Sequence, residues 1–175
     1  IFNPDVYIPE MLRQGKSLED AREGGCSGCI EVGAFGKEAY ILTGYLNVPK
    51  IIEITLNNGV NPVTGTQVSI KTGDPRDFKS YDELYEAFKK QLNYIVNKKV
   101  LVSNYIDRMF AKYSPATFLS VVIDDCISKG KDYYNGGPRY NTNYIQCTGL
   151  GTVTDSLSVL KKHVFENKSF SDFMR

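Results

Sequence analysis

Long apolar runs are absent from this sequence, and no stretch approaches the roughly 20 residues that a membrane-crossing helix requires. An excess of charge of one sign is also missing, since 21 Lys and Arg oppose 20 Asp and Glu and leave a formal net charge of +1. Such a chain has no strongly basic face to concentrate on phosphates. Neither a membrane location nor a nucleic-acid partner is supported by the sequence.

Cysteine and histidine are scarce. The four cysteines are few for a disulfide scaffold and follow no secretory signal, which favours a reducing cytoplasm. A structural zinc site is disfavoured, because only Cys26 and Cys29 form a close pair while Cys126 and Cys147 stand 21 residues apart. The single histidine, His163, lies in the basic segment LKKHVFE, where we expect a solvated surface residue. A hydrolase or protease with a Cys–His pair is therefore disfavoured.

The composition that remains is that of a globular protein. The 175 residues are 42% hydrophobic and 23% charged, enough for one ordinary domain with its own core. The chain starts at Ile1 without a methionine and stops as another amphipathic segment begins. We expect it to be a piece of a longer protein.

Periodicity predicts a helix-rich chain with one good strand. The clearest helix spans 80–113, where Ser80 and Glu83 form a capping box and apolar residues recur at intervals of three and four. The other predictions are helical patterns over 5–22 (capped at Ser17), from Lys37 to Val48, over 117–129 (ending at Gly130) and over 151–166 (capped at Thr152 or Thr154), a short element over 49–59 that favours helix, a loop or small hairpin over 59–79, and a strand over 139–149.

The segment GGCSGCIEVGAFGKEAY, residues 24 to 40, is the most unusual stretch. Its first ten residues contain four glycines, two cysteines and one acid. So many glycines destabilise a helix or strand but allow the sharp turns of a particular loop shape. In an extended segment, side chains at i and i+2 point to the same side, so Cys29 and Glu31 can face one substrate. That pair suits a nucleophile or radical centre beside a general acid/base. Two inert packing cysteines are the competing interpretation.

Several long motifs extend this interpretation. GCSGCIEVGAFGKEAYILTGYLNVPKIIEITLNNG is followed in order by KTGDPRDF, DDCISKGKDYYNGGPRYNTNYIQ and GTVTDSLSVLKKHVF. Together they resemble the interior of a glycyl radical enzyme of the pyruvate formate-lyase-like superfamily, over essentially the whole chain. The resemblance implies an α/β fold, in which this chain is a helix-rich part of a ten-stranded barrel with a cysteine finger loop. It implies that residues 1–175 are a partial catalytic domain, with the Cys loop at 24–36, a helical segment at 80–113 and a strand–helix unit at 138–166.

The resemblance also implies site residues. Cys29, in the family's Cys-x-Glu motif, would form the thiyl radical, and Glu31 would be the acid/base. Tyr45 occupies a place that resembles an active-site tyrosine of the members acting on trans-4-hydroxy-L-proline, although core packing explains it equally well. With that substrate the product would be pyrroline-5-carboxylate. The chain itself would hold no cofactor or metal, because the glycyl radical would lie on a segment absent here, installed by a radical-SAM activase in a full-length homodimer.

Departures from related patterns limit the choice of reaction. Cys29 is followed by Ile30 rather than by a second cysteine, which disfavours a formate acetyltransferase-like reaction. Val32 stands where glycerol and choline members usually have proline, and Pro138 and Cys147 replace the family's more common alanine and glycine. The Arg-Val-x-Gly-Tyr pattern of the glycine loop is absent. Two alternatives therefore stay open: another glycyl radical enzyme, such as a diol dehydratase, or a catalytically silent folding or interaction fragment.

Overall fold

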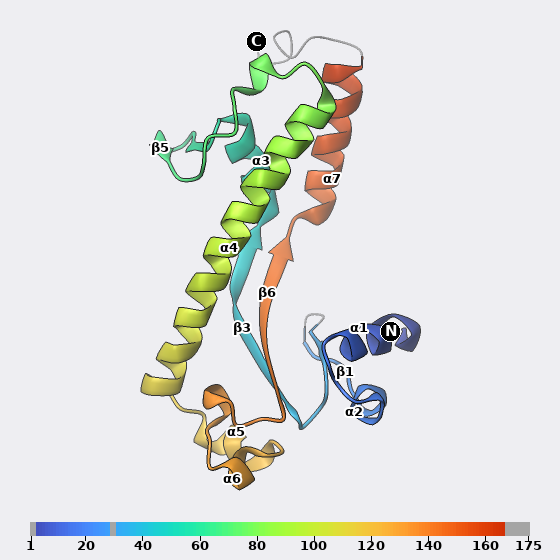
Figure 1. Cartoon of the computed structure of the whole chain (residues 1–175), viewed down its shortest axis with the longest axis vertical. Coiled ribbons are helices and arrows are strands. Elements are labelled where there is room, and N and C mark those ends of the chain that lie inside the picture. The colour runs from blue at the N-terminus through green and yellow to red at the C-terminus, as the bar shows by residue number, and fades with distance from the viewer. Residues whose placement is uncertain (1–2, 29–30, 167–175) are drawn as a thin grey trace. The chain divides into compact units, whose positions relative to one another are not determined.

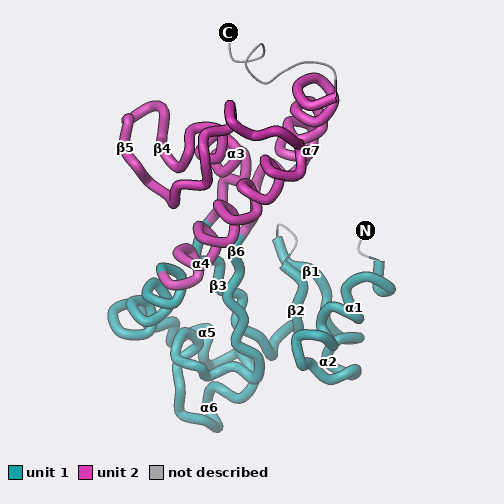
Figure 2. Tube along the Cα trace, turned by 45° about the horizontal axis from the view of Figure 1, so that its top comes forward, with its two compact units in different colours: residues 1–44, 102–145 teal, residues 45–101, 146–175 magenta. Residues whose placement is uncertain are grey.

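The computed structural model describes residues 3–28 and 31–166 and divides the chain into two compact units (Figures 1 and 2). The first unit contains residues 1–44 and 102–145, and the second contains residues 45–101 and 146–175. Helices and short paired strands occur in both. The predicted site residues Cys29 and Glu31 belong to the first unit, and Tyr45 belongs to the second.

The first unit opens with two short helices. α1 (Pro4–Arg13) starts after Asn3, whose side chain accepts a hydrogen bond from the Asp5 N–H at 2.9 Å. α2 (Leu18–Glu23) starts after Ser17, whose hydroxyl oxygen accepts from the Asp20 N–H at 3.0 Å, and ends at Gly24. The cap predicted at Ser17 is thus confirmed. Met11 and Ala21 from the two helices are fully buried and form a core cluster with Ala34.

A hairpin follows α2 directly. Strand β1 (Gly25–Cys26) pairs antiparallel with β2 (Val32–Gly33), so that Gly25 faces Gly33 and Cys26 faces Val32. The glycine-rich segment predicted to be a loop therefore contains two short paired strands of a β-hairpin (Figure 2).

The helical pattern predicted from Lys37 to Val48 is wrong, because the chain forms strand β3 (Glu38–Asn47) there. β3 pairs with β6 (Tyr140–Thr148), and hydrogen bonds from Tyr140 to Lys37 and from Thr148 to Leu46 show that the strands are parallel. Burial alternates along the start of β3, with Ala39, Ile41 and Thr43 inside, as expected for a strand. The strand predicted over 139–149 is confirmed as β6.

The single helix predicted over 117–129 is also wrong. Two short helices, α5 (Thr117–Val122) and α6 (Cys126–Lys129), occupy the segment. Asp125 between them adopts a left-handed conformation with φ of 75°, which interrupts the helical hydrogen bonds and which a short polar side chain tolerates. Gly130 ends α6 with φ of 59°, as predicted.

The second unit is mainly helical. The 49–59 segment forms α3 (Val48–Leu56), which starts after Asn47 and packs against α7 (Leu150–Val159). α7 starts after Gly149 rather than at a threonine cap, so the caps predicted at Thr152 or Thr154 are wrong. The helix continues as a π-helical turn over Leu160–Phe165. The small hairpin predicted within 59–79 is present as β4 (Val60–Asn61) and β5 (Thr66–Gln67), followed by a 3₁₀ turn at Pro75–Asp77.

The predicted long helix is α4 (Tyr81–Tyr113), which contributes residues to both units. At its start the Ser80 hydroxyl accepts from the Glu83 N–H at 3.3 Å, while the Glu83 carboxylate accepts from the Lys79 N–H at 2.8 Å. This arrangement resembles the predicted capping box, except that the Glu83 side chain bonds the N–H of Lys79 rather than that of Ser80. Leu84 and Phe88, on the inward face of the helix, are buried.

Candidate functional site

The predicted reactive residues, Cys29 and Glu31, lie in sequence between strands β1 and β2. Backbone and side-chain hydrogen bonds join the two ends of the connecting turn: the Ser27 N–H donates to the Glu31 carbonyl at 2.8 Å, and the Ser27 hydroxyl donates to the Glu31 carboxylate at 3.2 Å. Cys29 lies between these two residues in sequence and is outside the described residues. The prediction that Cys29 and Glu31 face one side therefore stays a prediction.

Three of the four glycines in this hairpin lie against other atoms of the chain, where a side chain would meet a close contact. A Cβ atom on Gly24 would lie 2.5 Å from the Gly33 carbonyl oxygen, and one on Gly25 would lie 2.9 Å from the Phe35 ring. A Cβ atom on Gly33 would collide with the Glu38 carboxylate. Gly28, at the turn, has open space around it, with no heavy atom of the described chain within 4 Å. Close packing at the base of the hairpin thus accounts for most of its glycine content.

Aromatic rings line the chain that follows the hairpin. Tyr40 stacks between Phe35 and Tyr144, with ring centroids 6.5 Å and 5.9 Å away. Burial, followed by the nearby Glu38 charge, raises the pKa of both the Tyr40 and the Tyr144 phenols, so both stay protonated near neutral pH. The Tyr144 hydroxyl donates to the Val32 carbonyl at 2.8 Å. Among the described residues, the enclosed Tyr40 hydroxyl has no hydrogen-bond partner.

A fully buried ion pair lies beside these rings. The ammonium nitrogen of Lys16 lies 3.0 Å from Oε1 of Glu38, and the two side chains are 1% and 0% exposed. The second carboxylate oxygen, Oε2, accepts from the Ala34 N–H at 2.7 Å, and Oε1 also accepts from the Thr142 hydroxyl. Every carboxylate oxygen of Glu38 is therefore bonded, which is the condition under which a buried charge is tolerated.

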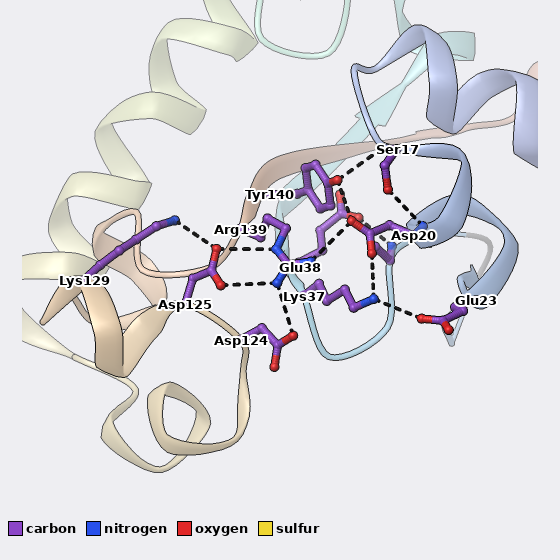
Figure 3. A network of polar contacts seen from close by, with 11 residues as sticks. Ser17, Asp20, Glu23, Lys37, Glu38, Asp124, Asp125, Lys129, Arg139 and Tyr140 are labelled. Atoms are coloured by element: carbon purple, nitrogen blue, oxygen red, sulfur yellow. Dashed lines mark hydrogen bonds and ion pairs between the residues drawn. The ribbon is translucent and has the colours of Figure 1, made fainter.

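A second polar network, centred on Asp20, adjoins this pair (Figure 3). Its carboxylate accepts from the Lys37 ammonium at 2.6 Å and from the Tyr140 hydroxyl at 2.6 Å. The hydrogen bond from Lys37 is the largest cause of a pKa of Asp20 well below its ordinary value, and the hydrogen bond from Tyr140 is the second largest. Lys37 also pairs with Glu23 at 3.0 Å. These contacts join α2 to Lys37, which follows the hairpin, and to Tyr140 at the start of β6.

Arg139 extends the Asp20 network towards α6 (Figure 3). Its guanidinium group lies 3.5 Å from Asp20, 3.5 Å from Asp124 and 3.4 Å from Asp125, and Lys129 lies 3.8 Å from Asp125. The left-handed Asp125 that separates α5 from α6 is thus held by two cations.

The other predicted residues differ in how far they are exposed. Tyr45 is on β3 in the second unit, with its side chain 63% exposed, so the packing interpretation of Tyr45 finds no support in the described chain. His163 is exposed, as predicted. Cys126 is buried, and desolvation raises the pKa of its thiol, whereas Cys147 is exposed. Within residues 3–28 and 31–166, no three His, Cys, Asp or Glu side chains are grouped closely enough to hold a metal ion.

Sequence reasoning missed the groups that hold the hairpin. Lys16, Glu38 and Tyr144 were not among the predicted site residues, because a charged residue is normally solvent-exposed and nothing in the pattern joins positions so far apart. The one available signal was the charged Glu38 at the start of a largely apolar segment. None of the helices in the described ranges has the length and apolar character needed to cross a membrane.

Comparison with known proteins gives consistent matches over nearly the whole chain. The sequence model of the family described as pyruvate formate lyase-like matches residues 1–172. The trans-4-hydroxy-L-proline dehydratase of Clostridioides difficile is 54% identical over 169 residues, which cover 97% of this chain and 21% of that protein. The (2S)-3-sulfopropanediol dehydratase of Klebsiella oxytoca is 34% identical over 98% of this chain and 21% of that protein.

Solved structures agree with the sequence matches. The crystal structure of the C. difficile hydroxyproline dehydratase with trans-4-hydroxy-L-proline bound superimposes with a TM-score of 0.90, covering 97% of this chain and 21% of that one. The glycerol-bound B12-independent glycerol dehydratase of Clostridium butyricum superimposes with a TM-score of 0.88 at 36% identity, again over 97% and 21% of the two chains. This chain therefore spans about a fifth of the length of the relatives it matches.

Proposed function

Because this chain belongs to the pyruvate formate lyase-like family, we propose that it supplies the thiyl-radical loop of a glycyl radical dehydratase that removes water from trans-4-hydroxy-L-proline. Family membership confirms the resemblance stated from the motifs, and the structural matches confirm the α/β fold class of the glycyl radical enzymes. The observation that carries the proposed substrate is the 54% identity to a hydroxyproline dehydratase over 97% of the chain. The product would be pyrroline-5-carboxylate.

In the proposed reaction, Cys29 and Glu31 divide the chemistry. A glycyl radical on a segment outside this chain would supply the oxidising equivalent that removes the thiol hydrogen of Cys29. The Cys29 sulfur then takes one hydrogen atom from a substrate carbon. Glu31 gives a proton to the departing hydroxide and takes one back from the cationic radical that remains, and the thiol returns the hydrogen atom to the neutral product radical. Hydroxyproline thus loses one water molecule, with no net oxidation or reduction.

The geometry of the hairpin supports these roles. Ser27 and Glu31 are bonded to each other across the turn that contains Cys29, so the acid is held within this short turn. Hydrogen-atom transfer requires reacting atoms about 3 to 3.5 Å apart, which demands a loop of fixed reach. The bonded network at the base of the hairpin, from Lys16 to Tyr144, is consistent with that demand.

The proposal extends to components outside this chain. The complete enzyme would be a homodimer activated by a radical-SAM activase, in an anaerobic cytoplasm where oxygen does not quench the radical. Residues 1–175 would be a partial catalytic domain without the glycyl radical segment. Tyr45 would contact the substrate.

The test uses the complete polypeptide that carries this chain, activated under anaerobic conditions with its radical-SAM activase. We expect trans-4-hydroxy-L-proline to be converted to pyrroline-5-carboxylate, and we expect the isolated 175-residue chain to convert none. Glycerol serves as the competing substrate. Turnover of glycerol without turnover of hydroxyproline would reject the proposed substrate but keep the dehydratase class, and turnover by the isolated chain would reject the partial-domain proposal.

A further inference from the structure

The hairpin that carries Cys29 and Glu31 is held at its base by side chains from outside it. The Tyr144 hydroxyl of β6 donates to the carbonyl of Val32, the residue directly after Glu31, at 2.8 Å. The same hydroxyl lies 3.4 Å from the Glu38 carboxylate. A phenol has one proton, so the shorter contact takes it, and Tyr144 fixes the main chain at the C-terminal end of the turn.

Glu38 fixes the main chain directly after strand β2. Its Oε2 accepts from the Ala34 N–H at 2.7 Å, and the space that a Gly33 side chain would need is filled by the Glu38 carboxylate and the Tyr40 hydroxyl. Val32, Gly33 and Ala34 are consecutive. The backbone that follows Glu31 is therefore hydrogen-bonded at Val32 by Tyr144 of β6 and at Ala34 by Glu38 of β3.

A buried ion pair at Glu38 is not the arrangement that gives the protein the greatest folding stability. Lys16 and Glu38 form a charged pair with side chains 1% and 0% exposed, and replacing such pairs by well-packed apolar residues is often neutral or stabilising. What an ion pair with directional bonds gives, and an apolar contact does not, is a fixed backbone position. Here Oε2 of Glu38 specifies where the Ala34 N–H lies, and the Lys16 ammonium and the Thr142 hydroxyl hold Oε1.

Resting on the proposed function above, we propose that Tyr144 and Glu38 are positioning residues that set the reach of the Cys29 loop. Neither acts on substrate directly: Tyr144 acts through the Val32 carbonyl, and Glu38 acts through the Ala34 N–H. A displacement of a reacting group by about 1 Å can lower the rate of an enzymatic reaction by about 100-fold. A loose hairpin base therefore lowers the rate of turnover per radical without preventing folding or activation.

The decisive experiment is Tyr144→Phe in the complete, activated enzyme, which deletes one hydroxyl and keeps the ring that stacks on Tyr40. We expect kcat per glycyl radical, counted by electron paramagnetic resonance, to fall at least about tenfold, with KM changed less than about twofold. The matched control is Tyr140→Phe on the same strand, whose hydroxyl bonds Asp20 and Ser17 rather than the hairpin. It should keep kcat within about twofold of the parent enzyme.

Glu38→Gln gives a second test. The amide still accepts hydrogen bonds, but it leaves the buried Lys16 ammonium without its opposite charge, so we expect kcat per radical to fall at least about tenfold. Lys16→Met combined with Glu38→Gln removes both charges and should recover part of that loss. If Glu38→Gln does not yield soluble enzyme, the Tyr144→Phe result decides alone.

The outcomes separate this inference from the proposed function. A merely structural role would lower the amount of radical-carrying enzyme but leave kcat per radical unchanged, and that result for Tyr144→Phe overturns the inference. An equal loss in Tyr140→Phe also overturns it. If the parent enzyme does not dehydrate hydroxyproline, or if Cys29→Ser stays active, the proposed function fails instead.

Discussion

The hydroxyl of Ser27 donates a hydrogen bond to the Glu31 carboxylate, with 3.2 Å between Oγ and Oε2, across the turn that contains Cys29. The backbone bond from the Ser27 N–H to the Glu31 carbonyl, at 2.8 Å, closes the same turn. Two bonds thus hold the acid beside the ends of the segment that carries the thiol. Ser27, four residues before Glu31 in sequence, thus bonds both the main chain and the carboxylate of Glu31.

Glu31→Gln removes the proton that the departing hydroxide needs. We expect kcat for dehydration by the complete enzyme to fall by about 10² to 10⁴, while the glycyl radical forms in normal yield. Glu23→Gln is the control, because Glu23 is a largely exposed carboxylate that pairs with Lys37, which is also bonded to Asp20. A Glu31→Gln enzyme with parental kcat would remove Glu31 from the acid/base role.

Gly24→Ala tests the packing of the hairpin. The added methyl group would lie 2.5 Å from the Gly33 carbonyl oxygen and 3.1 Å from the Asp20 carbonyl oxygen, and backbone atoms cannot easily move away. We expect a loss of about 1 to 3 kcal/mol in the local stability of the hairpin, measured by hydrogen exchange of its peptides. Gly28→Ala, at a position with open space, should leave the same exchange rates nearly unchanged. Equal effects of the two substitutions would contradict the packing argument.

How much of this molecule could be predicted depends on how local each signal is. The helix α4 was predictable because its cap and its apolar repeat are both encoded within neighbouring residues. Strand β3 was not, because Tyr40, Gly44 and Val48 also fit a helical repeat. Its strand conformation depends on pairing with β6, about 100 residues away in sequence, which periodicity does not detect.

The site shows the same division. The Cys29 and Glu31 pair could be singled out from a short motif and from the resemblance that this motif carries. The groups that hold it could not, because Lys16 and Glu38 are an ion pair between residues of ordinary surface type, brought into the interior by the tertiary fold. Directional contacts between distant elements are the part of a site that sequence patterns leave undetermined.

Ionisation of Asp20 makes the stability of the first unit depend on pH in the acidic range. The bonds from Lys37 and Tyr140 lower its folded-state pKa, so its stabilising contribution is complete above the ordinary aspartate pKa of about 4 and is lost as the pH falls below that value. We expect hydrogen exchange of α2, corrected for its intrinsic pH dependence, to accelerate between about pH 5 and pH 3 in the parent protein. Asp20→Asn should show faster exchange at pH 5 and a smaller change on acidification. An identical pH response in the two proteins would contradict this assignment.

Tyr45→Phe tests the proposed substrate contact. The Tyr45 side chain is 63% exposed in this structure, so loss of its hydroxyl should leave folding unchanged. Loss of one substrate hydrogen bond, worth about 1 kcal/mol, should raise KM for hydroxyproline about fivefold. Tyr105→Phe, at a similarly exposed residue of α4, is the matched control. Unchanged KM and kcat in Tyr45→Phe would remove this residue from the proposed site.

The most direct test of the whole account is turnover per glycyl radical in Cys29→Ser compared with Cys26→Ser, both in the complete, activated enzyme. The two substitutions exchange the same atom, three residues apart in one loop. We predict that Cys29→Ser forms the glycyl radical in normal yield but converts no hydroxyproline, while Cys26→Ser keeps turnover. Retained turnover in Cys29→Ser would contradict this prediction, because the thiol assigned to carry the radical would then not be needed for the reaction.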